Sequence, residues 1–354
     1  MAGLIAQTRT VVVRCDASPS IGYGHLVRCL ALADALRSDH DIRVVFAMTE
    51  ASAAPAVEAR GYDVHLGHAE LPPVANGEWL EHAILHEQAA ALVLDVRDEL
   101  PVDALRRWKG DGVLIATIDD PTERRLVADL AFYPPVPQVL SMDWSGFMGE
   151  LHVGWEWIIL RSDLLANRGD SPGREPPRAS VLVTMGGSDP AGLTLRVLTV
   201  IDTLAEDFDT TVVVGPAHVN ADALYAFLAV ARRTYRVERD IQNMGELMAR
   251  SQVAVAAFGS TAYELAVLGV PAITLSLTDD HAASAGALQK AGVGISLGVH
   301  AHVRDAEIAG AIRSLLSDEG RRRAMRRQAV AILDGLGAEC VARTITQRLE
   351  RASD

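Results

Sequence analysis

The chain has 354 residues, of which 33 are basic and 46 are acidic, so its formal net charge is −13. This length suggests about two domains, and a composition of 49% hydrophobic and 22% charged residues excludes a disordered, collagen-like or coiled-coil chain. The acidic balance argues against general nucleic-acid binding, which normally requires a basic surface.

Short apolar runs alternate with helical patterns along nearly the whole chain, which is typical of parallel sheets covered by helices on both faces. The predicted strands are Thr10–Arg14, Arg43–Ala47, Ala91–Asp95, Val113–Asp119, Leu130–Tyr133, Ser180–Thr184, Thr211–Val214, Val253–Ala256, Ala272–Leu275 and Gly292–Ser296. The segment 168–179 is rich in proline, glycine and charge, as expected of a linker. We therefore predict two doubly wound, Rossmann-like α/β domains that face a cleft, residues 1–167 and 180–320. A helical tail, 321–354, follows, and we interpret its arginine cluster as a solvated helix face.

The three cysteines, Cys15, Cys29 and Cys340, are too few and too scattered for a disulfide framework or a zinc cluster. A reduced, cytoplasmic location is the simplest interpretation, and the first residues lack the apolar core of a secretory signal. The most apolar stretch, 251–278, is interrupted by Glu264 and Pro271. We expect buried strands and a helix there rather than a membrane span.

The first predicted strand leads into Gly22, Tyr23, Gly24 and His25, and then into a helix. Glycines allow the backbone to approach a ligand closely, and this loop lies where open α/β sheets bind ligands. NAD binding is disfavoured, because the third glycine of the dinucleotide fingerprint is replaced by Val27. A structural turn with a surface histidine remains one interpretation. The other is that His25 acts as a base or hydrogen-bond donor. The predicted buried stripe of the helix comprises Leu26, Cys29, Leu30, Ala33 and Leu36.

Two loops of the second half also have features of phosphate sites. The segment Gly186–Asp189 follows a strand, and it is explained equally by phosphate binding or by a turn with a helix cap. The segment Gly259–Thr261 runs from a strand into a helix, whose free N–H groups could hold a diphosphate, with Glu264 contacting ribose hydroxyls. The alternative is that Thr261 and Glu264 form a capping box, which needs no ligand.

Taken together, these residues resemble a known family: the nucleotide-sugar hydrolases of pseudaminic acid synthesis, which group with spore-coat polysaccharide proteins (the PseG/SpsG-like family). The blocks 14–33 and 259–271 carry the most specific resemblance. Further similar blocks occur in the same order along the chain, at 118–120, 186–189, 243–248 and 334–339.

This resemblance implies a glycosyltransferase-B-like fold. It also implies hydrolysis of a UDP-linked amino sugar with inversion at the anomeric carbon, no cofactor, and no metal. His25 falls on the catalytic histidine. The implied substrate-binding residues are Gly22, Tyr23, Gly24, Arg28, Asp95, Asp280 and His281. The implied nucleotide-binding residues are Gly186, Gly187, Ser188, Ile241, Met244, Gly259, Ser260, Thr261 and Glu264.

The chain departs from the family pattern on the sugar side. Asp280 and His281 stand where the family carries an Asn-Gln pair, and Arg97 replaces the tyrosine of an Asp-x-Tyr motif. The run Asp279–His281 is explained by sugar contacts or by helix capping, whereas a metal site is disfavoured because adjacent residues rarely point at one ion. These departures keep a glycosyltransferase with a hydroxyl acceptor open as a second hypothesis. A non-catalytic sugar-nucleotide binding protein is the third. The sequence does not predict an oligomeric state.

Overall fold

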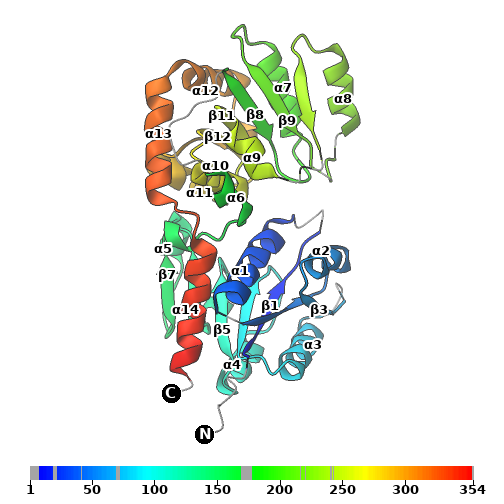
Figure 1. Cartoon of the computed structure of the whole chain (residues 1–354), viewed down its shortest axis with the longest axis vertical. Coiled ribbons are helices and arrows are strands. Elements are labelled where there is room, and N and C mark those ends of the chain that lie inside the picture. The colour runs from blue at the N-terminus through cyan, green and yellow to red at the C-terminus, as the bar shows by residue number, and fades with distance from the viewer. Residues whose placement is uncertain are drawn as a thin grey trace. The chain divides into compact units, whose positions relative to one another are not determined.

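The computed structural model describes residues 8–18, 22–40, 42–68, 72–168, 178–215, 217–219, 221–239, 241 and 243–352 (Figure 1). The chain divides into two compact units. Unit 1 comprises residues 1–135, 141–161 and 336–354, and unit 2 comprises residues 136–140 and 162–335. The segment 321–354, expected as one helical tail, is therefore divided between the units. Residues 169–177 of the expected linker lie outside the described residues.

Unit 1 contains a seven-stranded sheet in which all the paired strands are parallel, in the order β3-β2-β1-β4-β5-β6-β7. The strands are β1 (Thr10–Cys15), β2 (Arg43–Met48), β3 (Asp63–Leu66), β4 (Ala91–Asp95), β5 (Leu114–Ile118), β6 (Leu130–Tyr133) and β7 (Glu150–Val153). The helices are α1 (Gly24–His40), α2 (Ala54–Glu58), α3 (Pro73–His86), α4 (Val102–Gly110) and α14 (Gly337–Arg351), with 3₁₀ turns η1 (Ala51–Ala53), η2 (Glu123–Leu126) and η3 (Trp155–Trp157).

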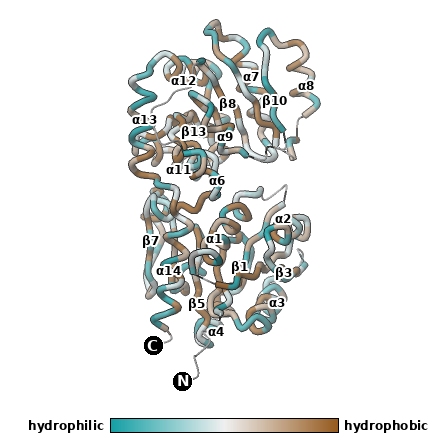
Figure 2. Tube along the Cα trace, viewed as in Figure 1, coloured by the Kyte–Doolittle hydropathy of each residue, from teal (hydrophilic) through white to brown (hydrophobic). Residues whose placement is uncertain are grey.

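The two faces of this sheet are covered by different helices, because side chains alternate along each strand. Val11 and Val13 pack with α1, α2 and α14. Val12, between them, packs with α3 and α4 on the other face. The predicted stripe of α1 is buried as expected, and Figure 2 shows hydrophobic colour along the strands of both units.

Unit 2 contains a six-stranded parallel sheet in the order β10-β9-β8-β11-β12-β13. The strands are β8 (Ser180–Thr184), β9 (Asp209–Val213), β10 (Tyr235–Glu238), β11 (Val253–Ala257), β12 (Ala272–Ser276) and β13 (Gly294–Val299). The helices are α5 (Pro137–Ser141), α6 (Asp163–Asn167), α7 (Leu193–Asp202), α8 (Ala221–Val230), α9 (Met244–Ala249), α10 (Ser260–Val267), α11 (Asp279–Lys290), α12 (Asp305–Ser317) and α13 (Glu319–Ile332), with the 3₁₀ turn η4 (His300–His302).

These two sheets confirm the predicted pair of doubly wound α/β domains. In each sheet the strand order reverses at one point, between β1 and β4 in unit 1 and between β8 and β11 in unit 2. The loops that leave the carboxyl ends of strands on either side of such a reversal frame the usual ligand site of open α/β sheets. Among the described helices, none combines the length and apolarity that a membrane crossing requires.

The predicted solvated arginine face of the last helices is wrong for two of its members. Arg322 and Arg326, both on α13, are buried. Arg322 donates from Nη1 to the carbonyl oxygens of Leu315 and Leu316, at 2.5 and 2.8 Å. Arg326 donates from Nε to the carbonyl oxygen of Gly269 at 2.8 Å. Both guanidinium groups therefore satisfy backbone acceptors inside unit 2 instead of facing water.

Candidate functional site

The reversal point of unit 1 brings His25 next to Asp95. His25 is the second residue of α1, reached from β1 through a turn in which the Gly22 N–H donates to the Ser18 carbonyl at 2.7 Å. Gly22 has φ +89°, a conformation that side chains disfavour, so the turn requires a glycine there. Asp95 is the last residue of β4, the strand beside β1. Residues 19–21 lie outside the described residues.

Asp95 is fully buried, and its carboxylate contacts the side chains of three residues on α1. Its Oδ1 lies 2.7 Å from His25 Nδ1. Arg28, one turn further along α1, donates to both carboxylate oxygens, with Nε 2.5 Å from Oδ2. The Cys29 thiol donates to Oδ2 at 3.4 Å. Burial opposes ionisation of Asp95, but the charge of Arg28 and the hydrogen bonds from Arg28 and His25 hold its pKa well below the usual range.

This arrangement fixes the tautomer of His25. An ionised carboxylate only accepts hydrogen bonds, so Nδ1 carries the proton and donates it to Asp95. Arg28 Nη2 lies 3.2 Å from the same Nδ1, but Arg28 is also only a donor, and it reaches this position because both side chains share Asp95. When the imidazole is neutral, Nε2 is therefore the unprotonated nitrogen. No other hydrogen-bond partner of His25 is found among the described residues, so Nε2 is free to contact a ligand.

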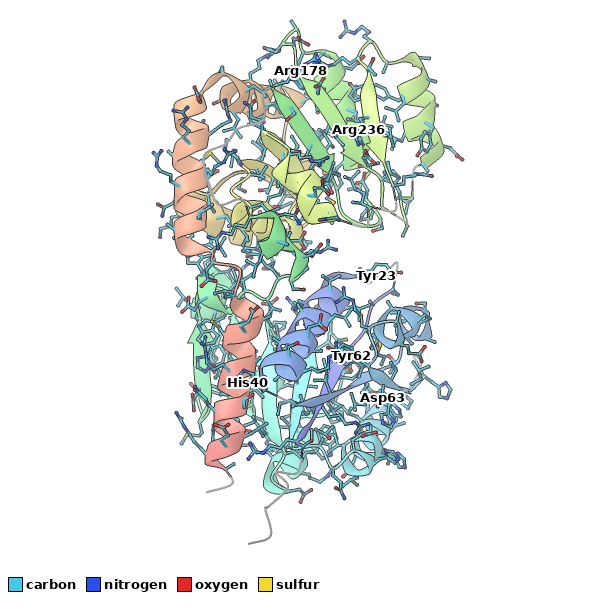
Figure 3. All side chains as sticks on the ribbon, in the orientation of Figure 1. Tyr23, His40, Tyr62, Asp63, Arg178 and Arg236 are labelled. Carbon is cyan, nitrogen blue, oxygen red and sulfur yellow. The ribbon has the colours of Figure 1, made fainter. Side chains whose placement is uncertain are left out.

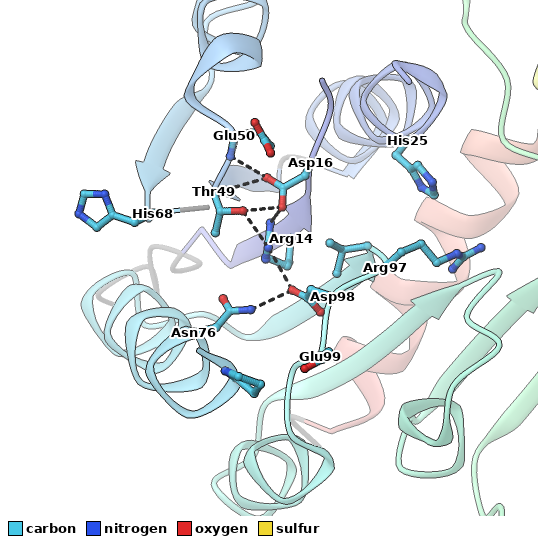
Figure 4. A pocket seen from close by; sticks show the side chains of 12 residues that line it. Arg14, Asp16, His25, Thr49, Glu50, His68, Asn76, Arg97, Asp98 and Glu99 are labelled. Atoms are coloured by element: carbon cyan, nitrogen blue, oxygen red, sulfur yellow. Dashed lines mark hydrogen bonds and ion pairs between the residues drawn. The ribbon is translucent and has the colours of Figure 1, made fainter. Parts of the chain in front are cut away.

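His25 lines a cavity of about 310 Å³ in unit 1 (Figure 4). The wall comes from the end of β1 and the loop after it, from the start of α1, from the loops that follow β2, β3 and β4, and from the start of α3. It consists of Arg14, Asp16, His25, Thr49, Glu50, His68, Pro73, Asn76, Val96, Arg97, Asp98 and Glu99.

The floor of this cavity is a network of buried charges centred on Arg14, whose side chain is 1% exposed. Arg14 forms ion pairs with Asp16 at 2.5 Å and with Asp98 at 3.0 Å. Asp98 is held from behind by Arg124, at 2.5 Å, and accepts from Asn76 Nδ2 at 3.1 Å. Every one of these carboxylate oxygens already accepts hydrogen bonds. The network therefore shapes the wall of the cavity, and we expect a ligand to bind to the less buried groups around it.

Asp16 joins two loops of this wall. Its Oδ1 accepts from the backbone N–H groups of Thr49 and Glu50, at 2.7 and 3.1 Å, and its Oδ2 accepts from the Thr49 hydroxyl at 2.8 Å. The carboxylate therefore fixes the loop after β2 to the end of β1, which keeps one side of the cavity rigid.

The other residues expected to bind substrate in unit 1 lie around His25 but differ in exposure. Tyr23, just before α1, is 37% exposed and stands at the surface (Figure 3). The Arg28 side chain is 22% exposed, and Asp95 is not exposed at all. Arg97, the residue that departs from the family pattern, pairs with Asp119 at 3.3 Å. Asp95 thus lies behind the imidazole, where it orients His25.

In unit 2, the loop Gly186–Ser188 leaves the carboxyl end of β8, on one side of the strand-order reversal. Both glycines are exposed, and Gly186 has φ +79°. A Cβ built at either glycine would meet no atom within 4 Å, so the backbone here is open. Asp189, which is buried, accepts from the N–H groups of Leu193 and Thr194, each at 2.8 Å. The helix cap expected as one alternative for this loop is therefore present, and it occupies two donors at the start of α7.

The loop Gly259–Thr261 leaves the carboxyl end of β11, on the other side of the same reversal. Gly259 is the N-cap residue of α10, and as a glycine it has no side chain to cap that helix. The capping-box alternative is wrong, because Thr261 lies inside the first turn and not at the cap. Ser260 is exposed and Thr261 half-buried, whereas Glu264 is 6% exposed. Without a capping side chain, the first N–H groups of α10 suit an anion.

Two further loops of unit 2 lie at the same edge of the sheet, after β12 and β10. Thr278 is the N-cap of α11 and accepts from the His281 N–H at 3.2 Å, so Asp280 is free of the capping role and is exposed. The His281 ring packs against Phe258 with centroids 5.9 Å apart. Its Nδ1 is buried and finds no hydrogen-bond partner among the described residues.

The loop after β10 contains the expected base-recognition residues Ile241 and Met244, which are both half-buried. Asn243 caps α9 by accepting from the Glu246 N–H at 2.9 Å. Asp240 and Gln242 lie outside the described residues. The four loops expected to bind nucleotide or sugar in this unit therefore all follow strands that end at one edge of its sheet.

Sequence reasoning missed the orienting role of Asp95 and the network around Arg14. A signal was present, since Arg14 and Asp16 lie at or just after the end of one buried apolar strand, and Asp95 and Asp98 lie at or just after the end of another. The carboxyl ends of parallel strands meet at one edge of a sheet, so charged residues at the ends of adjacent strands are expected to interact.

Comparison with known proteins identifies a distant relative that matches most of the chain. No family model matches it. The spore coat polysaccharide biosynthesis protein SpsG of Bacillus subtilis (strain 168) is 23% identical over 331 residues, which cover 92% of this chain and 95% of SpsG. The chain is a distant relative of SpsG. This relationship, over nearly the whole length, agrees with the resemblance seen in the motifs.

Solved structures share the fold. MurG of Acinetobacter baumannii superimposes with a TM-score of 0.72 at 14% identity, covering 96% of this chain and 99% of MurG. The spinosyn rhamnosyltransferase SpnG complexed with thymidine diphosphate gives a TM-score of 0.65 at 17% identity, covering 96% and 100%. At these identities the likeness concerns the fold, and it confirms the predicted glycosyltransferase-B-like architecture.

Proposed function

We propose that this chain is an enzyme that hydrolyses a nucleotide-activated sugar, with His25 as the general base. The observation that carries the proposal is the His25–Asp95 pair. A buried, ionised carboxylate holds Nδ1–H, and Nε2 is left as a base on a residue that lines a cavity. The relationship to SpsG and the glycosyltransferase-B-like fold support a sugar nucleotide as the substrate class.

Unit 2 is proposed to bind the nucleotide part of the substrate. The loops 186–188 and 259–261 flank the strand-order reversal, where α/β sheets bind ligands. The uncapped start of α10 offers N–H donors to a diphosphate, whose negative charge grows as it leaves. Fixed donors of this kind contribute about 3–4 kcal/mol each to a transition state. In SpnG, which has this fold, thymidine diphosphate is bound. By resemblance, a UDP-linked amino sugar is the first donor to test.

The proposed step is a single displacement. A water oxygen attacks the anomeric carbon while the bond from that carbon to the diphosphate oxygen breaks, and the bonding electrons leave with the nucleoside diphosphate. The water proton passes to His25 Nε2, and Asp95 stabilises the imidazolium that forms. Attack from the side opposite the leaving group inverts the anomeric centre. General-base assistance of this kind contributes about 10²–10⁴-fold.

A glycosyltransferase is the second candidate, and the cavity is the observation that favours it. Its volume of about 310 Å³ is many times the ~10–15 Å³ that one water requires. A sugar hydroxyl held there would meet the same base, and the same bond changes would transfer the donor sugar to that hydroxyl. SpnG, named as a rhamnosyltransferase, shows that the fold is compatible with transfer.

The deciding experiment supplies UDP-, dTDP- and GDP-linked sugars to the full chain without acceptor, and measures release of nucleoside diphosphate and free sugar. The proposal expects hydrolysis of at least one donor, loss of at least 10²-fold in the His25→Asn variant, and unchanged nucleotide binding by calorimetry. Turnover only after an alcohol acceptor is added would favour the transferase. Undiminished release by His25→Asn would remove His25 from the chemistry. Binding without turnover of any donor, with or without acceptors, would contradict both.

A further inference from the structure

A second group of reactive side chains lies in unit 1, and none of its members lines the cavity. It consists of His65 on β3, His86 at the end of α3, and Glu87, which follows that helix. His65 Nε2 lies 2.7 Å from Glu87 Oε1, and His86 Nδ1 lies 3.1 Å from the same oxygen. The three donor atoms all lie within 4.8 Å of one another.

The carboxylate in this group is held in place from behind. The Glu87 side chain is only 7% exposed, and its second oxygen, Oε2, accepts from Arg43 on β2. Arg43 is itself paired with Asp63, the first residue of β3, at 2.9 Å. A ligand oxygen whose partner oxygen is fixed by a second residue is a usual feature of metal sites, where outer hydrogen bonds orient the ligands.

The two imidazoles converge on one point. Their rings meet edge to face with centroids 5.4 Å apart, and both direct a nitrogen at Oε1. In a tetrahedral zinc site with bonds of 2.0–2.2 Å, neighbouring ligand atoms are ~3.3 Å apart. The separations of 2.7 Å for His65 and 3.1 Å for His86 are hydrogen-bond distances, and both are shorter than that value. Binding an ion therefore requires the His65 ring to move away from Oε1 more than the His86 ring, and the side chains of His65 and His86 are 25% and 62% exposed.

The chemistry of the donors selects the kind of ion. Two imidazole nitrogens and one carboxylate oxygen suit zinc, nickel, cobalt or copper, whereas calcium and magnesium prefer oxygen ligands alone. Three protein ligands leave a fourth position for water. Twenty residues separate His65 from His86, so the spacing carries none of the short motifs by which a metal site is found in a sequence.

We propose that His65, His86 and Glu87 bind a divalent transition-metal ion of the zinc class, which ties the edge strand β3 to the C-terminal end of α3. Because the ligands come from different elements, the site exists only in the folded chain, and bound metal stabilises the fold. The start of the same helix contributes Pro73 and Asn76 to the cavity wall, so the ion braces one side of that wall without taking part in the chemistry.

Three variants test this proposal. His65→Gln and His86→Gln each remove one ligand nitrogen. His82→Gln is the matched control, because His82 lies one turn before His86 on α3 and stacks on its ring with centroids 6.2 Å apart, yet it is outside the ligand group. The probes are ZnCl₂ in calorimetry and thermal unfolding, and CoCl₂ in visible spectroscopy, all with the full chain carrying no histidine tag.

We expect 1:1 Zn²⁺ binding, a melting temperature that rises with Zn²⁺ concentration, and the absorption of four-coordinate Co²⁺. Affinity should fall at least about 10-fold in His65→Gln and in His86→Gln, as it does even when outer hydrogen bonds of a metal site are removed, and should stay within about 3-fold in His82→Gln. Equal responses in all four proteins, or no response of the parent chain to either ion, would overturn the proposal. Since the melting temperature without metal reports folding separately, a variant that fails to fold is recognised, and the other ligand variant decides.

Discussion

The Nδ1 atom of His25 lies 2.7 Å from the Oδ1 atom of Asp95, a side chain that is completely buried. The two residues are 70 positions apart in the chain, and they meet because β1 and β4 are neighbours in the sheet although their sequence positions are distant. The pair gives the imidazole a defined tautomer, and it is the basis of the first prediction.

Replacing Asp95 with Asn is expected to lower kcat for nucleotide-sugar turnover by about 10²–10⁴-fold, because an amide can hold His25 in the wrong tautomer. KM and nucleotide binding should change little. The readout is steady-state kinetics of Asp95→Asn, His25→Asn and the double variant. If Asp95 acts through His25, the double variant is no slower than His25→Asn alone. Additive losses would mean that Asp95 acts independently of the imidazole.

Replacing Ser260 with Asp is expected to separate ligand binding from stability. A carboxylate at the start of α10 interacts favourably with the helix dipole, which stabilises the fold by about 0.3–1 kcal/mol. The same charge repels a diphosphate, and a penalty of 1.4 kcal/mol already weakens binding tenfold. Calorimetry with UDP should therefore show an affinity at least about 10-fold lower, while the melting temperature stays equal or rises.

The neutral variant Ser260→Asn is the control for this experiment, because it has nearly the same shape without the charge. It should bind UDP with an affinity close to that of the parent chain. Unchanged binding by Ser260→Asp would place the diphosphate elsewhere.

Replacing Arg14 with Met is expected to lower the free energy of unfolding by about 3–5 kcal/mol, since Asp16, which is buried, and Asp98, whose side chain is 17% exposed, would lose the cation that they share. Urea denaturation measures this loss. Arg107→Met is the matched control, because the Arg107 side chain is 56% exposed in its pair with Glu81, and such surface pairs contribute about 0–1 kcal/mol. Similar losses in the two variants would show that the network is not stabilised by its central arginine.

The same network predicts how stability depends on pH. Burial opposes ionisation of Asp98, but the charges of Arg14 and Arg124 and the hydrogen bonds from Asn76 and Arg124 lower its pKa below the usual value. A carboxyl whose pKa is lower in the folded than in the unfolded chain stabilises the fold above the unfolded pKa of about 3.9, and this contribution is lost as pH falls further. The parent chain should therefore lose stability more steeply than Asp98→Asn below about pH 4. Parallel curves in acid unfolding would contradict this.

The sequence predicted the central strands of both sheets and the edge strand β13, but it did not predict β3, β7 or β10. Each of these three strands has four residues and lies at an edge of its sheet, where it pairs with only one other strand. The residues of these strands are half-exposed or exposed. A central strand buried on both faces is a continuous apolar run, which single-sequence reasoning recognises. An edge strand such as Asp63–Leu66 is short and mixed in polarity, so its state depends on the strand beside it.

The candidate site was predictable to a similar degree. The loop that presents His25 was found from its glycines, because they permit a particular backbone path. The partner of His25 was not found, because burial of Asp95 depends on which strands are adjacent. Thr261 and Glu264 fit the spacing of a capping box, yet α10 begins at Ser260. That boundary is set by where β11 ends and the turn at Gly259 closes, which spacing alone does not determine.

The position of α14 has a consequence for biosynthesis. This helix, residues 337–351, completes the core of unit 1 with Ala338, Val341, Ala342, Ile345 and Leu349. Unit 1 contains β1, the first of the described strands, but its core is completed only by a helix that is translated about three hundred residues later, after the described residues of unit 2. During synthesis on the ribosome, unit 2 can therefore fold before unit 1, whose apolar face stays exposed until α14 has been made. A nonsense mutation near codon 337 would remove α14 and so destabilise unit 1, although most of unit 1 is translated before unit 2.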